Sequence, residues 1–106
     1  MAVKTFKVEE LVNREPFKGA CVNFVHSENM TLAEWKFDAD ISLPEHSHPH
    51  EQITKVISGK LELTIDGQKY FLETGSVAMI PPNAIHSAKT STDCYIIDVF
   101  NPVRED

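Results

Sequence analysis

Five histidines stand out among the residues able to do chemistry, and three of them, His46, His48 and His50, lie within five positions. Imidazole is the commonest neutral ligand for zinc, iron, copper and nickel. Residues two apart on a strand point to the same face, so His46 and His48 can face one ion if they lie on a strand. Because a protein metal site usually has three or four ligands, His86 and Gln52 are the further candidates. The cluster favours a metal site over a solvated, polar His-Pro loop.

A second candidate group lies near the C-terminus, where Asp98 is flanked by apolar residues. In a strand, Asp98 shares one face with Ile96 and Phe100. A carboxylate there is costly unless it is paired or hydrogen-bonded. Asp98 therefore either reaches solvent at the strand end or serves as an acid or base facing a cavity. Arg104 follows closely; its planar guanidinium suits a carboxylate, and the alternative is a solvated tail residue.

The elements that must position these residues are short strands. Turn signals recur every eight residues in the middle of the chain, at Ser58-Gly59, Asp66-Gly67, Thr74-Gly75 and Pro82-Asn83. This spacing predicts an all-β sandwich or barrel. Asp66-Gly67 predicts a type I′ hairpin, because both central residues need positive φ. The expected strands cover 20–25, 30–37, 61–65, 70–72, 77–80, 85–89 and 95–100, and at most one short helix fits, near 8–12.

Composition narrows the function classes. The chain has 106 residues, which predicts one domain over 1–106. The net charge is −6 and the ten basic residues are scattered, which argues against nucleic acid or an anionic membrane as the main partner. The sequence contains no apolar run of membrane-spanning length and no apolar signal-peptide stretch, so the cytoplasm is the expected compartment. Cys21 and Cys94 are expected to be reduced rather than joined in a disulfide.

Two motifs resemble those of the cupin superfamily. The first cupin motif reads Gly, five residues, His-x-His, three or four residues, Glu, six residues, Gly. Here it corresponds to His46-Ser47-His48, three residues, Gln52, six residues and Gly59. The second motif reads Gly, five residues, Pro-x-Gly, two residues, His. It corresponds to Gly75, five residues, Pro81-Pro82-Asn83, two residues and His86.

The resemblance implies a cupin-type double-stranded β-helix, or jelly-roll, barrel. It also implies a divalent transition metal, either zinc, nickel, manganese or iron, bound by four residues of the motifs. These are His46, His48, Gln52 and His86.

Three positions depart from the cupin motifs: Asp40 replaces the leading Gly, Gln52 replaces Glu, and Asn83 replaces Gly. Asn adopts positive φ more readily than most residues, so the change at Asn83 is mild. A neutral amide leaves the metal its full charge, which makes a stronger Lewis acid and attracts anions. Glu51 remains a competing ligand, and His50 is expected to be a loop residue or to support a ligand.

The chain further resembles the pectin-degradation, KdgF-like cupins. The matching runs are His46-Ser47-His48-Pro49-His50-Glu51-Gln52 and Asp98-Val99-Phe100-Asn101-Pro102-Val103-Arg104. Such cupins convert unsaturated uronates, released by pectin or alginate lyases, to linear ketonised sugars. The resemblance implies a small anionic substrate held by Gln52, His86, Asp98, Phe100 and Arg104. In this hypothesis Asp98 moves a proton, Arg104 holds the substrate carboxylate and the sugar ring stacks on Phe100.

Two other functions fit the same residues. One is a metal-dependent dioxygenase, although Gln52 in place of a carboxylate counts against the common two-histidine, one-carboxylate iron site. The other is a non-catalytic cupin that binds a sugar or metabolite. A homodimer is expected by resemblance, and because two-fold dimers are the commonest assemblies.

Overall fold

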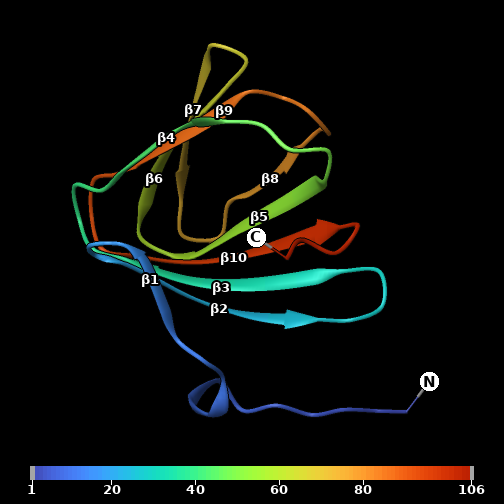
Figure 1. The fold of residues 1–106 in the computed structure, drawn as a ribbon. Coiled ribbons are helices and arrows are strands. Elements are labelled where there is room, and N and C mark those ends of the chain that lie inside the picture. Colours follow the sequence, from blue (N-terminus) through green and yellow to red (C-terminus); the bar gives the residue numbers. More distant parts are fainter. Residues whose placement is uncertain (1, 106) are drawn as a thin grey trace.

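Ten antiparallel strands form two sheets that fold around a common interior in the computed structural model, which describes residues 2–105 (Figure 1). The six-stranded sheet has the order β1-β2-β3-β10-β5-β8, and the four-stranded sheet has the order β4-β9-β6-β7. This jelly-roll arrangement confirms the predicted all-β cupin barrel. The strands are β1 Arg14–Phe17, β2 Ala20–His26, β3 Thr31–Phe37, β4 Ser42–His46, β5 Glu51–Ser58, β6 Lys60–Ile65, β7 Gln68–Glu73, β8 Val77–Ile80, β9 His86–Thr90 and β10 Cys94–Asn101.

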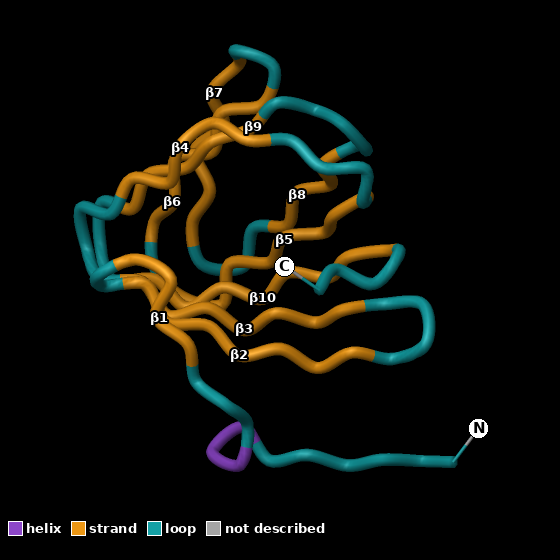
Figure 2. Tube along the Cα trace, in the orientation of Figure 1, coloured by secondary structure: helices purple, strands orange, loops and turns teal. Residues whose placement is uncertain are grey.

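All seven expected strands are confirmed, with ends shifted by at most two residues. The sequence did not predict β1, β4 or β5 as separate strands. The expected short helix is a single 3-10 turn, η1, over Val8–Glu10, in the segment that projects away from the barrel (Figure 2). Within residues 2–105, no helix is long and apolar enough to cross a membrane.

Backbone conformation explains the turns and two of the motif departures. Asp66 (φ 48°) and Gly67 (φ 83°) both have positive φ, as the predicted type I′ hairpin requires. Asp40 (φ 62°) and Asn83 (φ 66°), which replace two motif glycines, also adopt positive φ. Asp and Asn tolerate this region better than other non-glycine residues, so the chain keeps the turns without the glycines. Gly59 must remain glycine, because a Cβ there would collide with the Asp93 carbonyl oxygen.

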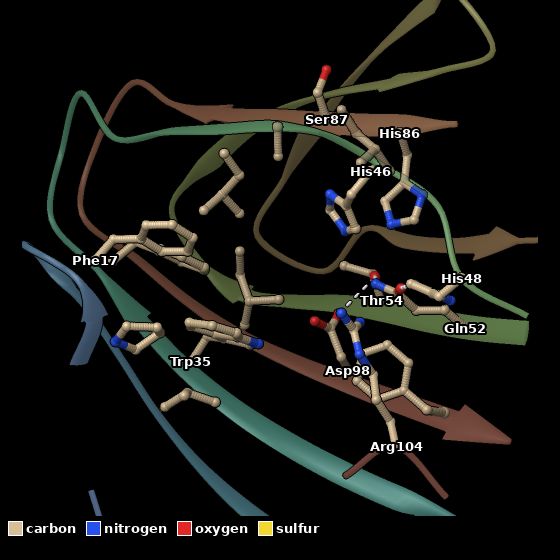
Figure 3. Close-up of a pocket in the computed structure, with 18 of the residues that line it drawn as sticks. Phe17, Trp35, His46, His48, Gln52, Thr54, His86, Ser87, Asp98 and Arg104 are labelled. Atoms are coloured by element: carbon tan, nitrogen blue, oxygen red, sulfur yellow. Dashed lines mark hydrogen bonds between the residues drawn. The ribbon is translucent and has the colours of Figure 1, made fainter. Parts of the chain in front are cut away.

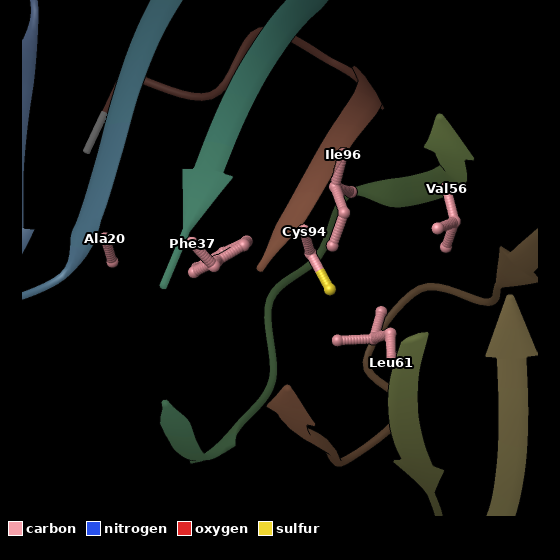
Figure 4. Close-up of a cluster of buried hydrophobic side chains, with 6 residues drawn as sticks. All are labelled: Ala20, Phe37, Val56, Leu61, Cys94 and Ile96. Atoms are coloured by element: carbon pink, nitrogen blue, oxygen red, sulfur yellow. The ribbon is translucent and has the colours of Figure 1, made fainter. Parts of the chain in front are cut away.

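Apolar side chains fill one end of the barrel. Six buried residues from five strands pack together there (Figure 4): Ala20, Phe37, Val56, Leu61, Cys94 and Ile96. Cys94 is a buried free thiol in this cluster, and Cys21 is also free. The inward-facing positions toward the other end carry polar residues instead. The sheets therefore enclose a core at one end and a polar site at the other.

Candidate metal centre

Strand pairing brings two histidines together across the four-stranded sheet. His46, the last residue of β4, pairs with His86, the first residue of β9. Their ring centroids lie 4.1 Å apart. The register between β4 and β9 shifts between Leu43 and His46, so an irregularity in β4 turns His46 toward the interior.

His48 reaches the same place by a different route. It lies in the loop after β4, so the expectation that His46 and His48 share the face of one strand is wrong. The loop nevertheless buries His48, with its ring centroid 5.0 Å from that of His86. One ligand atom of each of the three histidines lies within 4.8 Å of the others. His46, His48 and His86 therefore form a candidate divalent metal site.

Hydrogen bonds to the backbone fix the tautomer of all three imidazoles. Each Nδ1 faces a carbonyl oxygen, and a carbonyl can only accept, so Nδ1 carries the proton. The acceptors are the oxygens of Pro44, His50 and Ala84, at 3.0, 3.1 and 2.9 Å from the Nδ1 atoms of His46, His48 and His86. Each Nε2 then keeps its lone pair. This is the arrangement that metal-binding histidines use, with the outer N–H anchored to a carbonyl.

The site also keeps two of these histidines neutral. Burial lowers the pKa of His48 and of His86 below the usual 6.5, and the charge of Arg104 lowers both further. Within the described part of the chain, the buried Nε2 of His86 has no hydrogen-bond partner. Leaving a buried polar atom unpaired costs about 1–3 kcal/mol. A bound cation would satisfy this nitrogen, so the residues fit a metal.

Gln52 on β5 presents its side-chain oxygen to the same site. Its Oε1 lies 3.1 Å from the Nε2 of His48, and its Nε2 donates to the Oγ1 of Thr54 at 2.9 Å. Thr54 in turn donates to Asp98 Oδ1 at 2.7 Å. This chain of donors orients the amide with its oxygen toward His48. Two lone pairs facing each other are unfavourable alone and are compatible with a shared cation.

The alternative ligands lie elsewhere. Glu51 is exposed on the opposite face of β5, whereas Gln52 is buried among the histidines. His50 donates from Nε2 to the carbonyl oxygen of Val103 at 3.1 Å. It therefore holds the C-terminal segment against the barrel instead of joining the cluster.

Asp98 is a buried carboxyl next to this centre. It faces inward from the middle of β10 with 8% of its surface exposed. Burial raises the pKa of Asp98 from 3.8 to about 6, against the opposing effects of hydrogen bonds from Thr54 and Gln52 and of the charge of Arg104. An acid or base with a pKa near the working pH is suited to proton transfer. The alternative that Asp98 reaches solvent at the end of its strand is wrong, because the side chain is buried in the middle of β10.

The C-terminal segment brings Arg104 to the cavity. Its backbone N–H donates to Thr31 Oγ1 at 2.9 Å, which ties the segment to β3. The Arg104 guanidinium lies 4.9 Å from the centroid of the Phe100 ring, within cation–π range. Figure 3 shows Arg104 and Asp98 below His46 and His86, which project into the cavity from the four-stranded sheet. Arg104 is thus held beside the site and is not a solvated tail residue.

One cavity of about 650 Å³ contains all of these groups. Both sheets line it, and the three histidines, Gln52, Asp98, Phe100 and Arg104 all face it. Several further lining residues were not predicted from the sequence, among them Arg14, Phe17 and Trp35. Arg14 is the only other arginine of the chain and Trp35 its only tryptophan. The rarity of these residue types was the one available signal.

Comparison with known proteins agrees with this geometry. The family described as the cupin domain matches residues 33–100, nearly two thirds of the chain. The chain is a cupin. This cupin is 34% identical over 67 residues to the pectin degradation protein KdgF of Dickeya dadantii, covering 62% of this chain and 61% of that protein. It is 45% identical over 60 residues to quercetin 2,3-dioxygenase of Bacillus subtilis, covering 57% of this chain but only 17% of that enzyme.

A solved structure extends the similarity to the whole barrel. The cupin superposes on KdgF from Halomonas sp. with a TM-score of 0.90 and 27% sequence identity. The match covers 99% of this chain and 98% of the other. The resemblance to KdgF drawn from the motifs is therefore confirmed in both sequence and fold.

Proposed function

We propose that this cupin binds a divalent transition metal through His46, His48, His86 and Gln52, and that it converts unsaturated uronates to linear ketonised sugars. The metal would act as a Lewis acid toward an oxygen of the substrate. Four neutral ligands leave the ion its full charge, which favours an anionic ligand. The similarity to KdgF proteins, which the name of one relative links to pectin degradation, supports the choice of a uronate.

The observation that carries the proposal is the position of Asp98 and Arg104 in one cavity with the histidines. Arg104 offers a planar, permanently charged fork that can hold the substrate carboxylate with two hydrogen bonds. Asp98, with a pKa of about 6, can hold or release a proton near neutral pH. The Arg104 guanidinium lies over the Phe100 ring, which helps to hold it beside the site. Because only 3% of the Phe100 surface is exposed, this ring leaves little area on which a sugar could stack.

Ring opening and ketonisation of an unsaturated uronate need one group that can act as both base and acid. Opening the ring breaks the bond between the ring oxygen and the hemiacetal carbon, and the hemiacetal hydroxyl loses its proton. The electron pair of the broken bond stays on the ring oxygen as an enolate, which becomes a ketone by gaining one proton on carbon, so the proton lost and the proton gained balance. One carboxyl that first accepts and then donates a proton can serve both transfers. Asp98 is assigned this role, with Thr54 donating to its Oδ1 and so fixing its orientation.

The test is the ultraviolet absorbance of a 4,5-unsaturated uronate, which disappears as the conjugated double bond is lost. Metal-loaded protein should remove this absorbance far faster than the uncatalysed reaction, and the Asp98→Asn variant should be strongly impaired. Loss of absorbance at the uncatalysed rate with fully metal-loaded protein would reject the uronate assignment.

The second candidate function is a metal-dependent dioxygenase. One observation favours it: the 45% identity to quercetin 2,3-dioxygenase over 60 residues. The imidazole cluster also suits iron or copper. Oxygen consumption by the iron-loaded protein in the presence of an aromatic substrate, with no effect on unsaturated uronates, would support this function in place of the first.

A further inference from the structure

The six-stranded sheet changes chemistry along the cavity. On β10, Asp98 pairs with Ala33 of β3, and the previous inward-facing residue, Ile96, pairs with Trp35. These two positions are two residues apart, or about 7 Å along the strand. Along this sheet, the cavity wall therefore changes from the carboxyl of Asp98 to the apolar pair Ile96 and Trp35 over a distance that a small ligand can span.

The four-stranded sheet changes in the same direction. The His46–His86 pair lies at the metal end of β4 and β9, and the neighbouring pair is Leu43 with Ala88. Leu43 and Ala88 both line the cavity and pack against the apolar cluster. On both sheets the lining residues change from polar to apolar at corresponding positions. The cavity therefore has a polar half, near the histidines, and an apolar half.

Trp35 is the main surface of the apolar half. Its ring stacks on Phe37 with centroids 5.0 Å apart and planes 10° from parallel, which fixes the orientation of the indole. Trp35 is only partly buried and lines the cavity, so part of the indole ring remains accessible there. Figure 3 shows the indole nitrogen on the edge of Trp35 nearer Asp98.

Phe17 provides a second aromatic surface. It lies on β1, the edge strand of the six-stranded sheet, and 46% of its surface is exposed although it lines the cavity. Figure 3 shows Phe17 and Trp35 together at the end of the cavity away from His46 and His86. Exposed aromatic surface inside a cavity is apolar area that a ligand can remove from water.

We propose that the apolar half is a subsite for the aromatic ring of a ligand whose carboxylate lies at the polar half, near Arg104. The ligand class is therefore an aryl-substituted carboxylate. The ring would stack on Trp35 and contact Phe17, with the indole N–H donating to an oxygen of the ligand. This goes beyond the proposed function, because it concerns the part of the cavity that the histidines and Asp98 do not form.

A second sugar ring suits this half less well. Every hydroxyl of a sugar needs a hydrogen-bond partner once it leaves water, and an unpaired one costs about 1–3 kcal/mol. The walls supply mainly hydrocarbon and aromatic surface: Phe17, Phe24, Trp35, Phe37, Leu43 and Ile96. Arg14 and Glu15, both on the exposed strand β1, are charged residues that also line the cavity. An aryl ring needs no such partners and gains from burial.

Trp35 makes the test direct, because it is the only tryptophan and its fluorescence reports on this half alone. Zinc-loaded and metal-free protein are titrated with phenylacetate, 3-phenylpropionate and 4-phenylbutyrate, with acetate and digalacturonate as comparison ligands. At least one phenylalkanoate should change the Trp35 emission and bind ten- to a hundredfold more tightly than acetate, given the area of a phenyl ring.

Matched variants assign the effect to the subsite. Phe17→Ala should weaken the phenylalkanoate by roughly fivefold to fiftyfold. Phe71→Ala is the control, because Phe71 is 77% exposed on β7 and lies outside the cavity. It should leave binding unchanged. Trp35→Phe, followed by calorimetry, should retain ring binding but lose the contribution of the indole N–H.

Three results would overturn the subsite: phenylalkanoates that bind no better than acetate, equal losses in Phe17→Ala and Phe71→Ala, or tighter binding of digalacturonate than of every phenylalkanoate. None of these measurements needs turnover. If the protein binds phenylalkanoates but does not convert unsaturated uronates, only the proposed function is rejected. If it converts unsaturated uronates but does not bind phenylalkanoates, only the subsite is rejected.

Discussion

Replacing Asp98 with asparagine should stabilise the metal-free protein at neutral and alkaline pH. The folded protein raises the pKa of Asp98 from 3.8 to about 6, mainly through burial. The folded state therefore binds this proton more tightly than the unfolded chain, and ionisation above pH 6 destabilises the fold. The difference between the folded and unfolded pKa values of Asp98 corresponds to about 3 kcal/mol of unfolding free energy, because one pKa unit is worth roughly 1.4 kcal/mol. Asparagine keeps an oxygen to accept from Thr54 but never ionises.

The gain should depend on pH in a defined way. It should be near its full value of about 3 kcal/mol at pH 8 and fall to about 1 kcal/mol at pH 4.5, between the unfolded and folded pKa values of Asp98. Urea unfolding followed by the fluorescence of Trp35, with a chelator present, measures this. Asp93→Asn is the matched control, because Asp93 also accepts a hydrogen bond, from the Ala39 N–H, but is exposed. It should change stability by less than about 0.5 kcal/mol. A destabilised Asp98→Asn protein at pH 8, or a gain independent of pH, would refute the reasoning.

Three further predictions concern activity and assembly. Asp98→Asn should lower kcat on the unsaturated uronate by roughly 10²–10⁴-fold while metal content stays unchanged, since it removes the titrating proton; metal analysis beside the kinetics checks both. Arg104→Ala should mainly raise KM, because it removes a contact to the substrate carboxylate that ground and transition states share, and a kcat loss at constant KM would contradict that role. A homodimer is expected at micromolar concentration in sedimentation experiments, because the outer face of the six-stranded sheet exposes apolar side chains: Leu32, Ile53, Val77 and Met79.

Much of the barrel could be predicted from sequence because its signals are local. The turn at Asp66-Gly67 depends only on the φ preferences of two residues, and the alternation of β6 follows from its own side chains. The motif spacing likewise brought His46, Gln52 and His86 into one hypothesis. Such features need no knowledge of the tertiary contacts.

The features that sequence missed depend on long-range contacts. His48 reaches the site from a loop because its Nδ1 is held by the His50 carbonyl, and strand alternation gave the right residue for the wrong reason. All four residues of β1 are exposed and the strand pairs only with β2, so it has no alternating burial pattern of its own. Without β1, Phe17 could not be assigned to the cavity. Trp35 alternates like any core residue, and only the three-dimensional structure shows that it lines the cavity.

The most direct test of the metal centre is a crystal structure of the protein loaded with zinc or nickel, with diffraction data collected at the absorption edge of the metal. We predict one anomalous peak, about 2.0–2.3 Å from the Nε2 atoms of His46, His48 and His86 and from Oε1 of Gln52. Each Nδ1 should keep its hydrogen bond to a backbone carbonyl. A peak at another location, ligation through Nδ1, or a metal bound by Glu51 in place of Gln52 would contradict the account.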